Sequence, residues 1–394
     1  MTACTNRFNR TVRACYVGYI VQAIINNFAP LLFLTFERTY HLSADRIALL
    51  ITVNFGFQLA VDFLAANLID RLGQRFCIVF AHIAAAVGLV GLGFLPDLLP
   101  SPYAGLILSI GIYAVGSGLI EVMISPLVEA CPSSNKEAAM SLLHSFYCWG
   151  HVLVVIVSTV FFRLFGIENW RILACLWAVI PFCNIFVFLR VPLATLTENG
   201  RSAPISTLLR SKLFWLLVVM MLCAGASEQA MSQWASAFAE AGLGVSKTVG
   251  DLLGPCAFAV MMGLSRMFYG KSSGHIRLHR FMIISAVMCI GSYLLASLTK
   301  SAVWGLVGCA LCGLSVGIMW PGTFSIAAGA IPSGGTAMFS LLALAGDLGC
   351  ASGPALVGYA ETLRDGLLLA MVFPVVLAIG ILIFALHRKK SNTR

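Results

Sequence analysis

The chain has 394 residues, of which 59% are hydrophobic and only 10% are charged. A typical soluble domain is about 25% charged, so this composition excludes a water-soluble globule and predicts a protein of the lipid bilayer. The formal net charge is +9, but the basic residues lie between apolar runs without interleaved aromatic residues, which favours a role in membrane orientation over nucleic-acid binding.

The N-terminal stretch begins with basic residues and continues directly into an apolar segment, so we expect no cleavable signal peptide. Twelve apolar segments follow one another along the chain, and each reaches the roughly 20 residues that a membrane-crossing helix needs. They span residues 12–36, 45–69, 76–96, 102–130, 137–163, 170–190, 211–239, 248–270, 280–299, 302–330, 336–360 and 366–386. The sequence therefore predicts an all-α integral membrane protein with twelve transmembrane helices.

Lysines and arginines are distributed unequally between the two sides of these segments. Seventeen lie on one side and seven on the other, so the positive-inside rule predicts an inner or plasma membrane protein with both termini in the cytoplasm. The longest basic polar break, residues 190–212, lies near the midpoint. We therefore predict a six-helix bundle in residues 1–190, a cytoplasmic linker in 191–210 and a second bundle in 211–394.

The two halves of the chain resemble each other. ACPSSNKEAAMSLL, at 130–143, matches AIPSGGTAMFSLL, at 330–342, and both follow an apolar segment that contains a proline, Pro126 or Pro321. The offset is half the chain, which indicates a parallel repeat of two six-helix halves, one of the two repeat classes of transporters.

The cysteines indicate no disulfide framework. Most of the thirteen lie in apolar runs, where a thiol behaves as a small hydrophobic group. Cys309 and Cys312 form a CxxC pair, but the surrounding run GLVGCALCGLSVGIMW has no redox-fold pattern. A thioredoxin-like or metal-binding role for this pair is therefore disfavoured.

The loop after the second segment carries a family signature. It reads AANLIDRLGQR, residues 65–75, and resembles the G-x-x-x-D-R-x-G-R-R loop of the major facilitator superfamily, with Asp70, Arg71, Gly73 and Arg75 matching. In the second half only Gly270 and the basic character survive. The resemblance implies the major facilitator fold, with these residues in a gating role, and Arg266 is a further gating candidate. The alternative is a solvated turn whose arginines only fix the topology.

The fourth segment resembles one particular branch of this superfamily. Its pattern Glu121-Val-Met-Ile-Ser125-Pro126 is similar to the fourth helix of the fucose–proton symporter branch, where a proton-carrying glutamate precedes Asn-Pro. Stretches 139–150, 225–234 and 263–271 are also similar to that branch. The known branch members use an aspartate in the first helix, where this chain has amides instead.

Glu121 is the central candidate for proton coupling. It lies about 13 Å from the cytoplasmic boundary at 1.5 Å per residue, on one helical face with Tyr113, Ser117 and Ser125. Burial disfavours the charged carboxylate, which suits a residue that takes up and releases a proton. The alternative is a permanently protonated or paired structural glutamate.

Further ionisable groups lie in the apolar segments, where they usually face a cavity or a partner. Asp62 follows Asn54 and Gln58 at helical spacing, either as a second protonation site or as part of a polar contact between helices. His144 and His151 share a face with Tyr147 in the fifth segment; His144 is a candidate proton relay, although such histidines are often only hydrogen-bonded core. No further ligand at metal-site spacing is evident.

Two segments carry amides suited to a hydroxylated solute. The first segment carries Tyr19, Gln22, Asn26 and Asn27. The seventh carries Glu228, Gln229, Gln233 and Trp234. The alternative is ordinary polar contact between helices with an interfacial tryptophan.

The predicted solute-binding side chains also include Asn54, Gln58, Tyr147, His151, Trp320 and Asp347. Pro321 is expected to break the tenth helix near a cavity, with Trp320 in its wall. Arg266 must be compensated within the membrane, and its candidate partners are Asp62, Glu228 and Asp347.

These observations predict a secondary transporter that moves a small polar solute, a sugar or related compound, by proton-coupled symport with alternating access of the two bundles. No cofactor is expected, the proton is the expected coupling ion, and the partners are the solute and membrane lipid, with no nucleic acid and with a monomeric chain.

The alternative function is proton-driven export of drugs or metabolites. The fifth segment lacks the G-x-x-x-G-P-x-x-G-G signature of superfamily antiporters, although GCASGPALVG in the eleventh segment is similar to it. The sequence contains no DDxxD, HExxH, GxSxG or GxxxxGK[ST] motif, which disfavours an enzyme or a self-contained ATP-driven pump. A sensor without transport activity is a further alternative.

Overall fold

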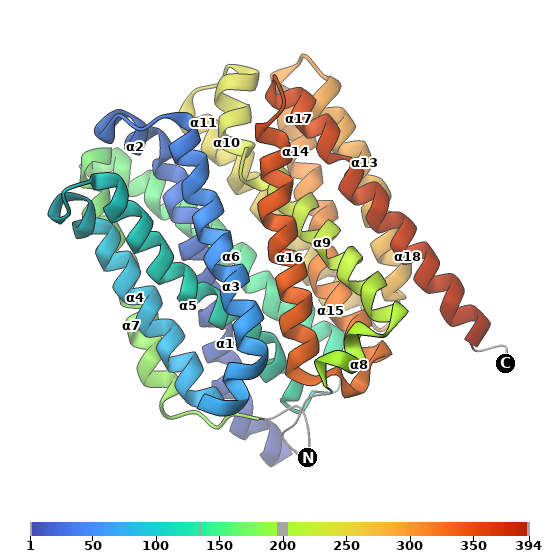
Figure 1. Ribbon diagram of the computed structural model, residues 1–394. Helices are drawn as coiled ribbons and strands as arrows, with labels where there is room; N and C mark the ends of the chain where they lie inside the picture. The colour runs from blue at the N-terminus through green and yellow to red at the C-terminus, as the bar shows by residue number, and fades with distance from the viewer. Residues whose placement is uncertain (1, 134, 195–203, 392–394) are drawn as a thin grey trace. The chain divides into compact units, whose positions relative to one another are not determined.

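The computed structural model describes residues 2–133, 135–194 and 204–391, and within these ranges every regular element is a helix (Figure 1). Eleven of the described helical stretches are long and apolar enough to cross a membrane, and a shorter apolar stretch, Leu49–Ala65, lies within a longer helix. Because an uninterrupted helix satisfies its own backbone hydrogen bonds, such helices are what a bilayer requires. The prediction of an all-α, twelve-helix membrane fold is confirmed.

The helices of the first half follow the predicted segments. They are α1 (Thr2–Phe28), the short η1 (Ala29–Leu32), α2 (Phe33–Tyr40), α3 (Ala44–Leu72), α4 (Gln74–Leu98), α5 (Pro102–Ala130), α6 (Lys136–Phe165), η2 (Ile167–Asn169) and α7 (Trp170–Phe188). Pro30 lies where α1 gives way to η1, since proline cannot donate the next helical hydrogen bond.

The second half contains more interrupted helices. Its elements are α8 (Ile205–Leu209), α9 (Lys212–Ser232), α10 (Ala235–Ala237), η3 (Phe238–Gly242), α11 (Lys247–Asp251), η4 (Leu252–Cys256), α12 (Ala257–Ser272), α13 (Leu278–Leu298), α14 (Ala302–Val316), α15 (Met319–Ala330), η5 (Pro332–Gly334), α16 (Gly335–Gly358), α17 (Leu363–Ala370) and α18 (Val372–Ser391). The predicted break near Pro321 is present, because α14 ends at Val316 and α15 begins at Met319.

The chain divides by its contacts into two units. The first comprises residues 1–134 and 146–201, and the second comprises 135–145 and 202–394. The first turns of α6 thus belong to the second unit, whereas the rest of that helix belongs to the first. The bundle boundaries drawn from the sequence stay a prediction.

The same packing pattern occurs inside each unit. In the first, α4 packs on α5 and α7, and α3 packs on α5. In the second, α13 packs on α14 and α18, and α12 packs on α14. These helices hold equivalent places in the two halves, so the pseudo-repeat predicted from the sequence is confirmed.

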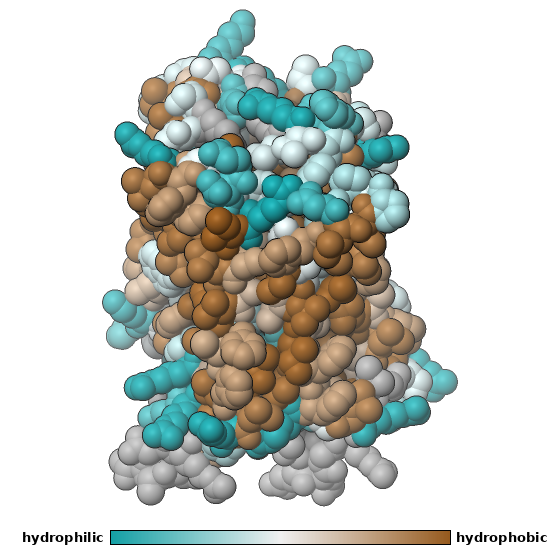
Figure 2. Space-filling view, turned by 90° about the vertical axis from the view of Figure 1, so that its left-hand side faces the viewer, coloured by the Kyte–Doolittle hydropathy of each residue, from teal (hydrophilic) through white to brown (hydrophobic). Residues whose placement is uncertain are grey.

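Hydrophobic side chains face outward along the membrane-spanning helices. On the face shown in Figure 2, they form a band with hydrophilic residues toward both ends. On α4 and α7, for example, Val87, Phe94 and Phe182 are each more than half exposed. Such large apolar patches are unfavourable in water but suit the hydrocarbon interior of a bilayer.

Glycines set the distance between α9 and α16. A Cβ at Gly349 would lie 2.0 Å from the carbonyl oxygen of Leu222, and one at Gly353 would lie 2.6 Å from that of Ala226. The two glycines form a GxxxG pair, which allows the backbones of membrane helices to approach closely. This contact holds together the core of the second unit.

Replacing Gly349 with alanine should therefore destabilise the protein by about 1–3 kcal/mol, the usual cost of overpacking, because the obstructing atom is backbone. Gly329→Ala is the matched control, since a Cβ there meets nothing within 4 Å. Thermal unfolding of the purified protein in detergent should give a lower apparent Tm for Gly349→Ala alone. Equal Tm values for the two variants would contradict this account of the α9–α16 contact.

Candidate functional site

In the first unit, Glu121 lies in the middle of α5 and faces α1. Its side chain is buried, and Gln22 Nε2 donates a 2.5 Å hydrogen bond to Glu121 Oε2. One helical turn away, the hydroxyl groups of Tyr19 and Ser125 lie 2.7 Å apart. The polar face predicted for α5 therefore meets the polar face predicted for α1, and the carboxylate lies at their contact.

Amide groups extend this contact to α3. Asn26 Oδ1 accepts hydrogen bonds from Asn54 Nδ2 at 3.1 Å and from Gln58 Nε2 at 3.2 Å. Ser117 of α5 donates to Gln58 Oε1 at 2.9 Å. All four side chains are buried, so α1, α3 and α5 are joined by an uncharged network beside Glu121. Asp62, one turn beyond Gln58, is fully buried.

Two acceptors in or beside this network are not used within the described part of the chain. Gln22 Oε1 and Asn54 Oδ1 are buried and have no hydrogen-bond partner among the described residues. A buried, unsatisfied acceptor costs about 1–3 kcal/mol. Hydroxyl donors of a bound solute would remove this cost, so these two atoms are the best candidates for direct contact with a polar ligand.

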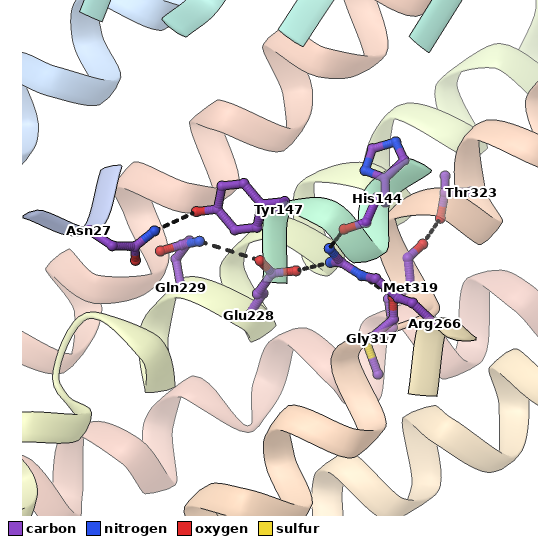
Figure 3. Close-up of polar contacts among 9 residues, drawn as sticks. All are labelled: Asn27, His144, Tyr147, Glu228, Gln229, Arg266, Gly317, Met319 and Thr323. Atoms are coloured by element: carbon purple, nitrogen blue, oxygen red, sulfur yellow. Dashed lines mark hydrogen bonds and ion pairs between the residues drawn. The ribbon is translucent and has the colours of Figure 1, made fainter. Parts of the chain in front are cut away.

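A second polar contact joins α1 to the later turns of α6. Asn27 Nδ2 donates to the carbonyl of Ala23 at 2.8 Å and to the Tyr147 hydroxyl at 3.3 Å (Figure 3). Gly150 permits this approach, because a Cβ there would lie 2.8 Å from Ala23 Cβ. The neighbouring His151 is buried, and its Nδ1 has no partner among the described residues.

The second unit contains a separate, charged cluster around Arg266. The guanidinium donates from Nε to Gly317 O at 2.7 Å, from one terminal nitrogen to His144 O at 2.8 Å and from the other to Glu228 Oε2 at 3.0 Å (Figure 3). Arg266 is only 2% exposed. Among the three acidic partners considered from the sequence, Glu228 forms an ion pair with Arg266 at 3.0 Å.

The amides of α9 continue from this ion pair. Gln229 Nε2 lies 3.5 Å from Glu228 Oε1, and Gln233 Nε2 donates to Gln229 Oε1 at 3.0 Å. The predicted row of polar side chains on α9 is therefore one connected chain of contacts that ends at the buried charge pair.

The two tryptophans pack against neighbouring side chains and backbone in the same unit, which also contains Asp347. The Trp234 indole donates to Pro354 O at 3.0 Å. The Trp320 ring lies so close to Gly346 that a Cβ there would be 2.2 Å from it, and it meets Phe324 edge-on. Asp347, next to Gly346, is buried. The predicted contact of these residues with solute stays a prediction.

The signature loop has a clear structural role at two of its positions. Gly73 joins α3 to α4 with φ of +87°, a conformation that favours glycine. Arg75 donates to the carbonyls of Phe188, Leu189 and Val191 at 2.8–2.9 Å, so it caps the C-terminal end of α7, where a positive charge is favourable.

The other gating candidates are less informative. Arg71 is exposed at the end of α3, and the Asp70 side chain lies outside the described part of the structure. A Cβ at Gly270 would lie 3.6 Å from the carbonyl oxygen of Ala138, so this glycine lies against the first turns of α6.

Of the proton-relay candidates, His144 is buried with its ring 6.0 Å from that of Phe324.

Sequence reasoning did not identify a polar contact of α1, α4 and α7. Asn184 Nδ2 lies 2.9 Å from His82 Nε2 and donates to Ala14 O at 3.1 Å, while His82 Nδ1 lies 2.8 Å from Ile78 O. Because a carbonyl only accepts, Nδ1 carries the proton and Nε2 accepts from Asn184. The available signals were His82 in the third segment and one amide, Asn184, in the otherwise apolar run 172–189.

Comparison with known proteins identifies the family. The sequence profile of the Major Facilitator Superfamily matches residues 15–354. The chain belongs to this superfamily of membrane transporters. No curated protein matches this facilitator by sequence.

Solved structures show how widely the fold is shared. The E. coli fucose:proton symporter FucP aligns with a TM-score of 0.76 at 16% identity over 96% of this chain and 99% of FucP. The proton:xylose symporter XylE, with 6-bromo-6-deoxy-D-glucose bound, gives 0.81 at 11% over 97% and 96%. The human organic anion transporter MFSD10 gives 0.73 at 15% over 94% and 99%. These similarities extend over the whole chain and establish the fold.

Proposed function

We propose that this facilitator carries out proton-coupled symport of a small polar solute, a sugar or related hydroxylated compound, by alternating access. It acts as a monomer in the inner or plasma membrane, with both termini in the cytoplasm, and needs no cofactor. Glu121 carries the proton, with Asp62 and His144 as further proton-coupling candidates, and the loop around Asp70 contributes to gating.

The observation that carries this proposal is the placement of Glu121 beside an uncharged amide network. Glu121 is 6% exposed and receives a hydrogen bond from Gln22, so proton binding at the carboxylate changes the hydrogen bonding of the Gln22 amide, one turn from Asn26 on α1. The buried acceptors Gln22 Oε1 and Asn54 Oδ1 suit solute hydroxyl groups. A shared amide gives a direct route by which proton and solute binding favour each other.

Two relatives support the same function by analogy of fold. FucP and XylE are named as sugar:proton symporters, and Glu121 matches the position of the proton-carrying glutamate in the branch pattern. MFSD10, which is named as an organic anion transporter, illustrates that the fold alone does not fix the substrate.

The test is the external pH of de-energised cells that express the protein, measured while sugars, polyols and other small polar solutes are added in turn. Symport predicts alkalinisation with one solute class, at a rate above that of cells without the protein. No alkalinisation with any solute would contradict the proposal. Ethidium retention in the same two cell lines separates the second candidate, proton-driven export, which predicts lower retention when the protein is present.

A further inference from the structure

The first turns of α6 are fastened to α12 by a row of contacts inside the second unit. We call residues 135–145 the α6 strap. From its start onward, the contacts join Asn135 Nδ2 to Ser273 Oγ at 2.9 Å, Glu137 Oε2 to the Tyr269 hydroxyl at 2.8 Å, Ser141 Oγ to Arg266 O at 2.6 Å and His144 O to the Arg266 guanidinium at 2.8 Å. These four contacts are hydrogen bonds, which have discrete made and broken states.

Within this row of contacts, Arg266 also donates hydrogen bonds to elements other than the strap. Its Nε bonds the carbonyl of Gly317, at the break between α14 and α15. That carbonyl is left without its helical donor because the residue four positions later is Pro321, which has no N–H. The remaining terminal nitrogen of the guanidinium donates to Glu228 on α9. One side chain therefore joins the strap, the helix break and the amide row of α9.

The Glu228 carboxylate supplies a counter-charge for Arg266 in this buried position. The two side chains are 2% and 8% exposed, and a buried charge without its counter-ion is strongly unfavourable. If Glu228 is neutralised, the guanidinium gains by moving toward water or another charge. Such a move breaks the hydrogen bonds of the guanidinium to the carbonyls of His144 and Gly317, because its three nitrogens belong to one rigid plane.

We propose that Arg266 is a positioning residue that couples the charge of Glu228 to the attachment of the α6 strap, so that loss of this charge loosens the strap from α12. This inference goes beyond the proposed symport. It rests on that function in one respect only: a solute bound at Gln229 and Gln233 would act on the strap through Glu228, to which these amides connect.

Disulfide cross-linking at the far end of the strap tests the coupling. Asn135→Cys and Ser273→Cys are introduced together, and a protease site is placed between residues 195 and 203. After oxidation with copper phenanthroline and cleavage, the two halves stay together on a non-reducing gel only if the cross-link has formed. Each single-cysteine variant must give separate halves, which excludes a contribution from native cysteines.

The rate of cross-linking is then compared with Glu228→Gln, Arg266→Lys and the control Glu361→Gln, whose acid is exposed in the same unit. Glu228→Gln should slow cross-linking at least about fivefold, the lower end of typical coupling between sites. Arg266→Lys should also slow it, because one ammonium group cannot hold the three acceptors in the same fork. Glu361→Gln should leave the rate unchanged.

A wild-type rate in either Glu228→Gln or Arg266→Lys would overturn the proposal, and so would equal slowing by Glu361→Gln. Having two variants keeps the test decisive if one fails to fold. Cross-linking requires neither a solute nor proton movement. A negative result here therefore leaves the symport proposal untouched, and failure of symport leaves the cross-linking result valid.

Discussion

Replacing Glu121 with glutamine should reduce solute-driven alkalinisation to the background of cells without the protein. Glutamine has nearly the shape of glutamate and still offers a carbonyl oxygen to Gln22 Nε2, which now donates to Glu121 Oε2 at 2.5 Å. The variant therefore keeps the contact between α1 and α5 but has no group that binds and releases a proton. Uptake driven by the proton gradient should be lost for the same reason.

Exchange of labelled for unlabelled solute should persist in Glu121→Gln, because exchange needs solute binding and reorientation but no net proton movement. The matched control is Glu168→Gln, which makes the same change at an exposed acid in the first unit and should transport normally. Undiminished alkalinisation in Glu121→Gln would remove the glutamate from the proton pathway. Equal loss in Glu168→Gln would show that the assay does not isolate Glu121.

The helices could be predicted from the sequence because the bilayer leaves few alternatives. Each apolar segment must satisfy its backbone internally, and helical spacing then defines which residues of one segment share a face. This reasoning placed Ser117, Glu121 and Ser125 on one face of α5. It also placed Tyr19, Gln22 and Asn26 on the first helix, and both faces take part in the network that the structure describes.

The helix that each polar face contacts could not be predicted. Helical spacing shows which residues of one helix share a face, but it does not show which helix packs against that face. Arg266 illustrates the limit: three acids were equally good candidates, and only tertiary packing brings Glu228 to 3.0 Å. The strap contact between Glu137 and Tyr269 could not be predicted either, because neither residue indicated its partner. Each looks like an ordinary residue near the end of an apolar segment.

Aromatic residues show a further limit of the sequence. Trp234 beside amides suggested contact with a solute, and Trp320 beside Pro321 suggested the wall of a cavity. In the structure Trp234 donates its N–H to Pro354 O and Trp320 lies against Gly346, and their contact with solute stays a prediction. Packing of an indole against glycine and ligand stacking require the same residue type. The sequence therefore cannot distinguish them, whereas Gly73, with its positive φ, could be read directly from the loop motif.

Replacing Arg266 with methionine should lower the free energy of unfolding by about 3–5 kcal/mol, the usual cost of removing one partner of a buried ion pair. Methionine fills most of the space but leaves the Glu228 carboxylate buried without a counter-ion, and it leaves the carbonyls of His144 and Gly317 without their donor. The double variant Glu228→Gln/Arg266→Met removes both charges. It should be more stable than Arg266→Met alone, because the unpaired charge is then gone.

The control is the same substitution in an exposed pair. Arg171 lies 3.0 Å from Asp97, as Arg266 does from Glu228, but its side chain is 34% exposed and that of Asp97 is 55% exposed. Water screens such a pair, so Arg171→Met should cost less than about 1 kcal/mol for the ion pair itself. Apparent Tm values in detergent should therefore rank Arg171→Met highest, the double variant next and Arg266→Met lowest. If the double variant were no more stable than Arg266→Met, the cost would come from lost packing and carbonyl contacts, and the Glu228 charge would not be what holds Arg266 at the centre of the second unit.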